Sequence, residues 1–556
     1  MSDSLKGLAK ALHIALQDGD TDYVMKLFNA REHQDEIKNN SSDVIRAICC
    51  HLTFANQETN PEVFECCFKL INTISVSSNT EDVLLQLVTE IEESKDKSKF
   101  TALLEPLYEV LVRTSPKKYT SFCWCFNAIQ TFLCNNNMLR DYGNTKANKT
   151  CAPDERRFVY NIAYLYEKVI IFYTKCQTFV ESEDQTLRNV IRKFLMQLLG
   201  NVFSHLTAGR GGLTMSEGRK LAEQIVERIF KNLSVVDPIA LSELWYDRDP
   251  NDFTRTDIYS LANYMFLIYS EGLHYTSIPK VYTHQFVLES SLHLATSMLE
   301  LGNIVEIENG IKLTLRLLSP IGIGELPYDL LVCERHPQFC TVVTNVIIYN
   351  YCEKLRKAAM QMFIQYLLRF EPKALYTILY NLLTTINHSG MKGFLVTIYK
   401  DSLDKNFTKK SEDLLPFYRG PKMFRLLRKF CHLEEMENTN IIDNSDQIIS
   451  ALNLIRYMIL KDKDNITQLK DFVPVLEEIF LDPLRRGLEL SKAHYDLEIH
   501  NINNEQSGND EALSNAYGPE FPKMSKLERL NFLKISRTVL DVISCLLVRV
   551  TEVIEN

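Results

Sequence analysis

Apolar residues recur at helical spacing along almost the whole of this 556-residue chain. One such series, in which residues three and four positions apart share a face, is Ile378, Leu379, Leu382, Leu383 and Ile386. Glycines and prolines are few, 19 and 17 respectively, whereas a sheet protein needs many tight turns. The pattern therefore predicts an all-α fold.

Short polar interruptions divide this pattern into pairs of helices. The sequence Asn-His-Ser-Gly at 387–390 ends the series above, and a second apolar series follows with Phe394, Leu395 and Ile398. Two amphipathic helices joined by a few polar residues are typical of an antiparallel hairpin. Pairs of this kind recur roughly every 35–50 residues, which predicts an α-solenoid of irregular HEAT-like helical hairpins.

Several helix ends can be predicted in the C-terminal part of the chain. Asn444 and Gln447 have the spacing of a capping box, in which side chains satisfy backbone N–H groups of the first turn. Pro483 suits the first turn of a helix that continues through Ile499. A last helix is predicted from about Lys526 to Glu555.

Two longer interruptions organise the rest of the chain. Residues 207–219 contain four glycines and predict a flexible loop between helices. The acidic stretch 245–257, which carries Pro250, predicts a boundary between two halves of the solenoid. We therefore expect one HEAT-like domain at 1–250 and a second at 251–556.

Charge and hydropathy exclude some classes of partner. The formal net charge is −9 at pH 7, which disfavours nucleic acid, because phosphate binding needs a concentrated basic surface. No window approaches the roughly 18 uncharged apolar residues of a membrane span, and the N-terminal residues lack the pattern of a signal peptide. The 14 cysteines are expected to be reduced core thiols. We expect a cytoplasmic protein, with the nucleus as a further location, and no membrane partner.

Cys333, His336 and Cys340 form a C-x2-H-x3-C cluster that resembles part of a zinc site. A structural zinc site needs four ligands, and no fourth cysteine or histidine lies nearby in the sequence. We therefore predict no metal site, and interpret the cluster as a core cysteine pair beside a surface histidine.

Motifs of enzymes and nucleotide-binding proteins are not matched. The glycines of 207–219 lack the spacing and the preceding strand of a phosphate-binding loop. The aspartates of 247–258 lack the glycine and the final glutamate of a calcium loop. No nucleophile, metalloprotease or kinase motif occurs, so we predict no catalytic residue and no cofactor. A cysteine–histidine dyad assembled in three dimensions is an alternative that the sequence leaves open.

Polar and aromatic residues at helix ends and loops of the C-terminal half are the remaining candidates for a functional surface. Tyrosine and arginine are enriched at protein–protein hot spots, and both types occur in this set. The alternative is that Arg456 and Tyr457 cap their helix and that His494 is simply solvated.

Five ordered segments of the chain resemble the glomulin family. They are SLANYMFLIYSEGLHYTSIP at 260–279, NHSG at 387–390, the Tyr-Arg-Gly-Pro turn at 418–421, NSDQIISALNLIRYMILKDKDN at 444–465 and DPLRRGLELSKAHYDLEI at 482–499. The resemblance extends over roughly residues 257–555. The N-terminal part, of 240 or so residues, shares only length and helical character with the family.

The glomulin family is known for HEAT-like repeats and for binding the RING-box subunit of cullin–RING ubiquitin ligases. The resemblance implies a non-enzymatic regulator whose C-terminal half covers the RING, blocks docking of the ubiquitin-conjugating enzyme and so inhibits ubiquitin transfer. The positions expected at the partner face are Leu383, Thr384, Asn387, His388, Tyr418, Arg419, Arg456, Tyr457, Lys461, Lys492 and Tyr495.

Two other functions stay open at this point. One is a generic HEAT-like adaptor for a signalling or chaperone partner, and in either case the partner of the N-terminal half is unknown. The other is a helical enzyme, which requires an interior pocket with convergent titratable groups of perturbed pKa.

Overall fold

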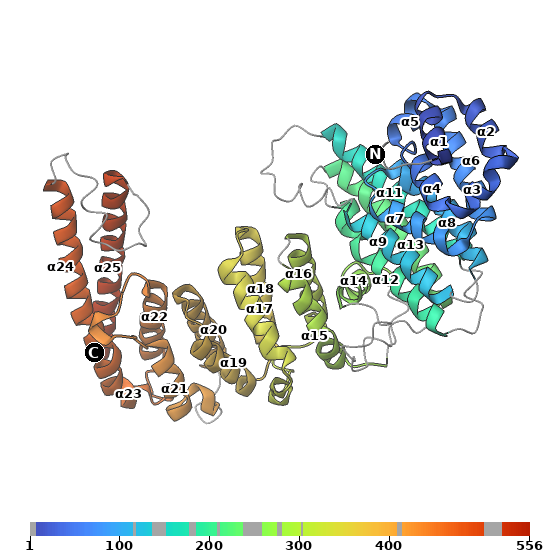
Figure 1. Ribbon diagram of the computed structural model, residues 1–556. Coiled ribbons are helices and arrows are strands. Elements are labelled where there is room, and N and C mark those ends of the chain that lie inside the picture. Colours follow the sequence, from blue (N-terminus) through green and yellow to red (C-terminus); the bar gives the residue numbers. More distant parts are fainter. Residues whose placement is uncertain are drawn as a thin grey trace. The chain divides into compact units, whose positions relative to one another are not determined.

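The computed structural model describes residues 7–114, 118–135, 152–176, 185–207, 212–236, 258–274, 281–301, 304–407, 414–504 and 525–555. Within those ranges the chain is helical almost throughout, and its β structure is limited to one isolated bridge between Leu326 and Phe370. Helices that follow one another in sequence pack as pairs (Figure 1). The predicted all-α fold, an α-solenoid of irregular HEAT-like hairpins, is confirmed.

The chain forms two compact units, which comprise residues 1–317 and 318–556. The boundary predicted at residue 250 falls in the stretch 237–257, which lies outside the described residues. The contacts within the chain divide it further along, between Leu317 and Leu318.

The N-terminal unit is built from helices of very different length. They are α1 (Gly7–Gln17), α2 (Thr21–Asn29), α3 (Gln34–Asn39), α4 (Ser41–Cys49), α5 (Phe54–Thr59), α6 (Pro61–Ser77), α7 (Thr80–Glu92), α8 (Lys97–Arg113), α9 (Lys118–Asn135), α11 (Ala152–Cys176), α12 (Gln185–Thr207), α13 (Gly212–Val236), α14 (Ile258–Tyr269), α15 (His284–Glu300) and α16 (Ile304–Leu318). None of the helices in the described ranges, in either unit, is long and apolar enough to span a bilayer.

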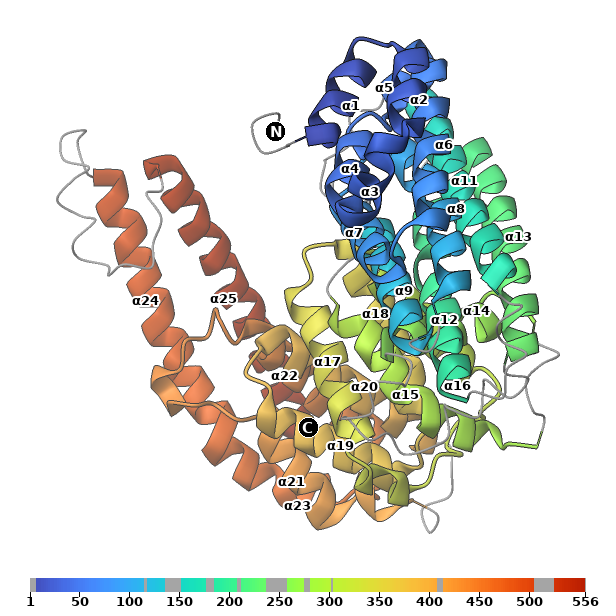
Figure 2. The same ribbon diagram turned by 45° about the vertical axis from the view of Figure 1, so that its right-hand side comes forward.

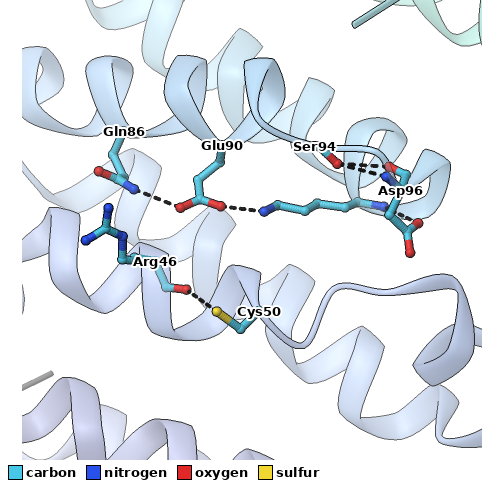
Figure 3. A network of polar contacts seen from close by, with 7 residues as sticks. Arg46, Cys50, Gln86, Glu90, Ser94 and Asp96 are labelled. Carbon is cyan, nitrogen blue, oxygen red and sulfur yellow. Dashed lines mark hydrogen bonds and ion pairs between the residues drawn. The ribbon is translucent and has the colours of Figure 1, made fainter. Parts of the chain in front are cut away.

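A buried ion pair joins α7 to α8 in the N-terminal unit (Figure 3). Glu90 of α7 accepts hydrogen bonds from Lys99 of α8 and, at 2.9 Å, from the side chain of Gln86. Asp96 begins α8 by accepting from the backbone N–H groups of Ser98 and Lys99 at 2.8 and 3.3 Å. Burial alone lowers the pKa of Lys99, but the hydrogen bond and charge of Glu90 raise it above its ordinary value. The lysine is therefore held charged inside the unit.

The C-terminal unit carries the segments on which the family resemblance rests most heavily. Its helices are α17 (Arg335–Tyr349), α18 (Glu353–Leu368), α19 (Pro372–Thr385), α20 (Ser389–Phe407), α21 (Gly420–Phe430), α22 (Ser445–Lys461), α23 (Leu469–Leu476), α24 (Asp482–Asn504) and α25 (Lys526–Glu555). The predicted break at 387–390 separates α19 from α20, and the last helix has the predicted ends. Short 3-10 and π turns at Pro416–Tyr418 and Glu477–Leu481 precede α21 and α24.

Helices α20 and α22 lie side by side and run in the same direction. At their N-terminal ends the backbone N–H of Gln447 donates to Ser389 at 3.1 Å. At their C-terminal ends the phenol of Tyr457 donates to Asp404. Helices α19 and α21 are aligned in the same way in the other layer, because Tyr380 and Lys429 meet near their C-terminal ends. Two layers of aligned helices are the arrangement expected of stacked hairpins.

Two local predictions were wrong. Asn444 makes no capping hydrogen bond with its side chain, and the buried amide of Gln447 instead donates to the carbonyls of Phe430 and His432 at 2.9 and 3.3 Å. The capping box does not form, because the side-chain amide of Gln447 is already hydrogen-bonded to carbonyls of another segment. The loop expected at 207–219 is also shorter, since α13 already begins at Gly212. Burial of its apolar residues further along outweighs the roughly 1 kcal/mol that each helical glycine costs.

Candidate partner-binding surface

One exposed face runs along the aligned helices α20 and α22, and we call it the α20/α22 face. Successive residues on it are spaced three and four apart, so they lie on one side of each helix. The face comprises Phe394, Thr397, Asp401 and Asp404 from α20 and Asn453, Arg456, Tyr457, Leu460 and Lys461 from α22, all exposed or half-buried. Three of the predicted partner residues therefore share one surface.

Tyr457 is held in place at the C-terminal end of this face. Its hydroxyl donates to Asp404, and the ammonium of Lys461 lies 3.8 Å from the same carboxylate. Lys400 lies over the tyrosine ring at 5.8 Å, and Phe407 meets it edge-on at 6.4 Å between centroids. Burial raises the pKa of the phenol, and Asp404 raises it further, so the hydroxyl stays a neutral donor.

Asn387 and His388 mark the other end of the face, where α20 begins. The Nδ1 atom of His388 accepts from the backbone N–H of Met391 at 3.1 Å, so the imidazole caps the helix. Asn387 is exposed and accepts from Lys392 at 3.5 Å. Thr384, one turn earlier, is exposed and its hydroxyl donates to the carbonyl of Tyr380 at 2.8 Å. These side chains are accessible and also have local structural roles.

The two predicted arginines are both half-buried. Arg456 lies on the α20/α22 face, and its Nε atom is buried without a hydrogen-bond partner among the described residues. Arg419 precedes α21 in extended conformation and lies outside the face. Of the two, Arg456 has the better position to meet a partner.

Lys492 and Tyr495 belong to a separate structure, the hairpin in which α24 and α25 lie side by side (Figure 2). Lys492 pairs with Asp541 at 3.0 Å, and Arg537 bridges Asp541 and Asp496 at 2.5 and 2.8 Å. Burial raises the pKa of Tyr495, and the nearby Ser536 of α25 offsets part of that rise. These residues hold two helices together.

Leu383 and Tyr418 are buried, which corrects their assignment to an exposed surface. Leu383 is 6% exposed and belongs to the inward stripe of α19. Tyr418 is 2% exposed, and its hydroxyl lies 2.7 Å from that of Ser402 inside the unit. Tyrosine often lies at a surface because its hydroxyl needs a hydrogen-bond partner, but the hydroxyl of Tyr418 has its partner inside the unit.

The interpretation of the Cys333–His336–Cys340 cluster was partly wrong. His336 is 1% exposed, and its Nδ1 atom lies 2.7 Å from the hydroxyl of Tyr366. Burial lowers the pKa of His336 to about 4, so the imidazole is neutral. Cys340 is buried as expected, whereas Cys333 is exposed. The histidine is thus the core residue and Cys333 lies at the surface.

The part of the chain that the structure describes holds no group of three or more metal-ligating side chains. A depression of about 420 Å³, open to solvent, is formed by residues of α24 and α25. The depression is lined by Lys492 and Asp541, which are already paired, and its cysteine, Cys545, is exposed. An enzyme requires convergent titratable groups in an interior pocket, whereas this depression lies at the surface.

Asp401 and Asp404 were missed by the sequence interpretation. Asp404 contacts a tyrosine 53 positions further along the chain, and only the packing of α20 on α22 reveals that contact. A signal was nevertheless present, since Thr397, Asp401 and Asp404 form a polar stripe at helical spacing.

Comparison with known proteins relates these helices to one family. A family model described as "Uncharacterised protein family, YAP/Alf4/glomulin" matches residues 310–531. Glomulin from Homo sapiens is 25% identical over 573 residues, covering 97% of this chain and 92% of that protein. Glomulin from Mus musculus is 24% identical over 563 residues with the same coverage.

The chain resembles glomulin along nearly its whole length. The resemblance predicted for residues 257–555 is confirmed. The expectation that the N-terminal 240 or so residues share only length and helical character was wrong, because the match covers 97% of the chain. Among solved structures, the crystal structure of Kap121p bound to Ste12p is 9% identical, with a TM-score of 0.21, over 96% of this chain and 62% of that one. A score this low carries no structural inference.

Proposed function

We propose that this chain binds the RING-box subunit of cullin–RING ubiquitin ligases through the α20/α22 face and thereby blocks the ubiquitin-conjugating enzyme. The proposal follows from the similarity to glomulin, the family to which that activity belongs. The family match at 310–531 includes every residue of the face.

The dimensions of the face suit a single partner domain. From His388 to Asp404 the helix α20 rises about 24 Å, at about 1.5 Å per residue. A standard interface buries about 800 Å² on each partner, which corresponds to a patch roughly 30 Å across. One compact domain can therefore touch both ends of the face.

The observation that carries the proposal is the fixed position of Tyr457 beside Asp404. A tyrosine held by its hydroxyl, a cation and a second ring loses little conformational freedom on docking. Asp401 and Asp404 add exposed carboxylates to the face, and Leu460 is 48% exposed beside them. An aromatic anchor with carboxylates and an apolar side chain suits a RING surface that offers apolar and basic groups.

Steric occlusion is the mechanism that these residues allow. A rigid helical face that covers the RING leaves no room for the conjugating enzyme, and no chemical step is needed. Inhibition is then competitive with the conjugating enzyme and depends on occupancy of the RING alone.

The test is a ubiquitin-discharge assay with a neddylated cullin–RING core, a charged conjugating enzyme and increasing amounts of the full chain. We expect dose-dependent loss of transfer, relieved by excess conjugating enzyme. The variant Tyr457→Ala should weaken inhibition by about 30-fold or more, the effect typical of a hot-spot residue.

The matched control is Tyr349→Ala, which removes an exposed tyrosine of the same unit outside the face. That variant should inhibit like the unmodified chain. Undiminished ligase activity at saturating protein, with no binding to the RING-box subunit, would overturn the proposal and leave an adaptor for another partner.

A further inference from the structure

A second surface of the C-terminal unit has a different chemical character. Helices α19 and α21, in the layer opposite the α20/α22 face, carry a row of cations that we call the basic ridge. The basic ridge comprises Lys373, Lys422, Arg425, Arg428 and Lys429. Four of these side chains are exposed and Lys429 is half-buried. The proposed function does not use them.

Aromatic rings form the floor beneath these cations. Lys422 lies over the ring of Phe417 at 4.4 Å, and Lys429 lies over Tyr380 at 5.7 Å. Tyr376 links the two rings, with centroids 5.5 Å from Phe417 and 6.3 Å from Tyr380. Lys373 and Arg428 cover the rings of Tyr328 and Phe472 at 3.7 and 5.3 Å. Four of the five cations are thereby held over aromatic rings.

The two helices of the basic ridge lack carboxylates, and Glu371, just before α19, already accepts from the backbone N–H of Tyr328 at 2.9 Å. Neither α19 nor α21 contains an aspartate or a glutamate, although the whole chain has a net charge of −9. Among the described residues none of the five cations lies within ion-pair distance of a carboxylate. Other exposed cations of the unit, such as Lys357 and Arg486, do have such partners. Within the part of the chain that the structure describes, the basic ridge is therefore a cationic patch without ion-pair partners on an acidic protein.

We propose that the basic ridge binds an extended segment of a partner protein that is rich in aspartate and glutamate. Charge complementarity identifies the occupant, because five neighbouring cations, four of them held over aromatic rings, attract a run of carboxylates. The spacing of the cations also matches the spacing of side chains along an extended peptide. Along α21, Arg425 and Lys429 are about 6 Å apart, and alternate residues of an extended peptide are about 6.6 Å apart.

Nucleic acid fits this surface less well than an acidic peptide. Single strands bind by stacking bases on exposed aromatic faces. Here the ring faces are already covered by lysine and arginine, and Tyr376, Tyr380 and Phe417 are only half-exposed. A membrane surface is disfavoured because no large apolar side chain is exposed among the described residues of 352–435. An interfacial helix needs such side chains to enter the lipid boundary.

The experiment measures binding of a fluorescent twelve-residue peptide of alternating glutamate and serine to the full chain by anisotropy. Binding should be saturable and should weaken steeply between low and physiological ionic strength. The variant Arg425→Glu/Lys429→Glu should weaken it by about 10-fold or more. The neutral variant Arg425→Gln/Lys429→Gln should have a peptide affinity between those of the unmodified chain and the charge-reversed variant. It replaces the charge-reversed variant in the test if charge reversal disturbs folding.

The matched control is Lys354→Glu/Lys357→Glu on α18, which changes the net charge by the same amount at exposed positions. It should alter the affinity by less than about two-fold, because screening removes most long-range effects. Equal weakening by the control and the ridge variant would show that only net charge matters and would overturn the proposal.

Two further probes decide between classes of partner. A twelve-nucleotide thymidine oligomer and phosphatidylserine vesicles replace the peptide in the same assay. Tighter ridge-dependent binding of either one would overturn the proposal. The RING-box assay is independent, since Tyr457→Ala should leave peptide binding intact and the ridge variant should leave ligase inhibition intact.

Discussion

Gly393 of α20 lies directly against the backbone of Asp446 at the start of α22. A Cβ atom at Gly393 would be 2.8 Å from the Asp446 carbonyl oxygen and 2.9 Å from the hydroxyl of Ser450. No side chain fits between the two helices at this point, and their close approach sets the alignment of the α20/α22 face.

Gly393→Ala should therefore destabilise the C-terminal unit, even though alanine favours helix. We expect a loss of about 1–3 kcal/mol in the free energy of unfolding, the usual cost of overpacking. Denaturant unfolding checks this, together with hydrogen exchange in α20 and α22. Gly200→Ala is the control, because its Cβ would meet only Asn263 at 3.4 Å. That change should be neutral or stabilising, and a similar loss at both glycines would contradict the packing argument.

Tyr457→Phe isolates the hydrogen bond to Asp404 from the rest of the ring. The ring packing against Lys400 and Phe407 remains, so we expect RING-box affinity to fall by about 3- to 10-fold, which corresponds to one hydrogen bond. Titration calorimetry of the full chain against the RING-box subunit measures the change. If Tyr457→Phe were as damaging as Tyr457→Ala, the hydroxyl would have to contact the partner directly.

The buried pair of Glu90 and Lys99 should respond differently to single and double changes (Figure 3). Lys99→Met leaves the carboxylate of Glu90 buried without a cation, and we expect a loss of about 3–5 kcal/mol from the N-terminal unit. The double variant Glu90→Leu/Lys99→Met removes both charges and should recover much of that loss. Denaturant unfolding of the three proteins provides the comparison, and strictly additive losses would argue against a coupled pair.

Acidification should weaken the packing of α1 on α4. His51 is 9% exposed, and its Nε2 lies 3.0 Å from Nδ1 of His13 on α1. Burial and the neighbouring imidazole lower the pKa of His51 from 6.5 to about 4. The unfolded chain thus takes up a proton first as the pH falls, and the free energy of unfolding decreases between pH 6.5 and 4, by at most about 3 kcal/mol.

Hydrogen exchange of the α1 and α4 amides, measured across that pH window, is the suitable readout. This readout distinguishes the effect of His51 from that of His336. The pKa of His336 is also lowered, so that histidine also reduces the stability of the C-terminal unit as the pH falls. His51→Gln should remove the pH dependence in α1 and α4 and leave α17 unchanged. A slope in α1 that persists in this variant would assign the effect to another group.

The helices of the C-terminal unit were largely predictable, because their ends coincide with strong local signals. Polar residues interrupt the apolar series between α19 and α20, and α25 has a buried, mostly apolar stripe from Ser536 to Val550. The capping box at Asn444 shows where such reasoning fails. Its glutamine found carbonyl partners on a segment that precedes it by 15 to 17 residues.

The site was harder to predict than the fold, because exposure depends on packing between helices. Leu383 was assigned to the surface although the apolar series itself places it on the inward stripe, next to Thr384 on the outward side. Tyr457 and Lys461 were predicted from the resemblance to the glomulin family, and the structure leaves Lys461 exposed and Tyr457 half-buried on α22. Asp404 was not, since its contact with Tyr457 exists only once two distant hairpins have stacked.

The common direction of α20 and α22 has an electrostatic consequence. The N-termini of both helices lie at one edge of the face and their C-termini at the other, so the free N–H groups of the first turns gather at one edge and the free carbonyls of the last turns at the other. The edge at Asn387 and His388 therefore carries partial positive charge, and the edge at Lys461 carries partial negative charge. Asp446 in the first turn of α22 and Lys461 in its last turn complement that field. This arrangement favours one of the two orientations in which a charged partner can lie along the face.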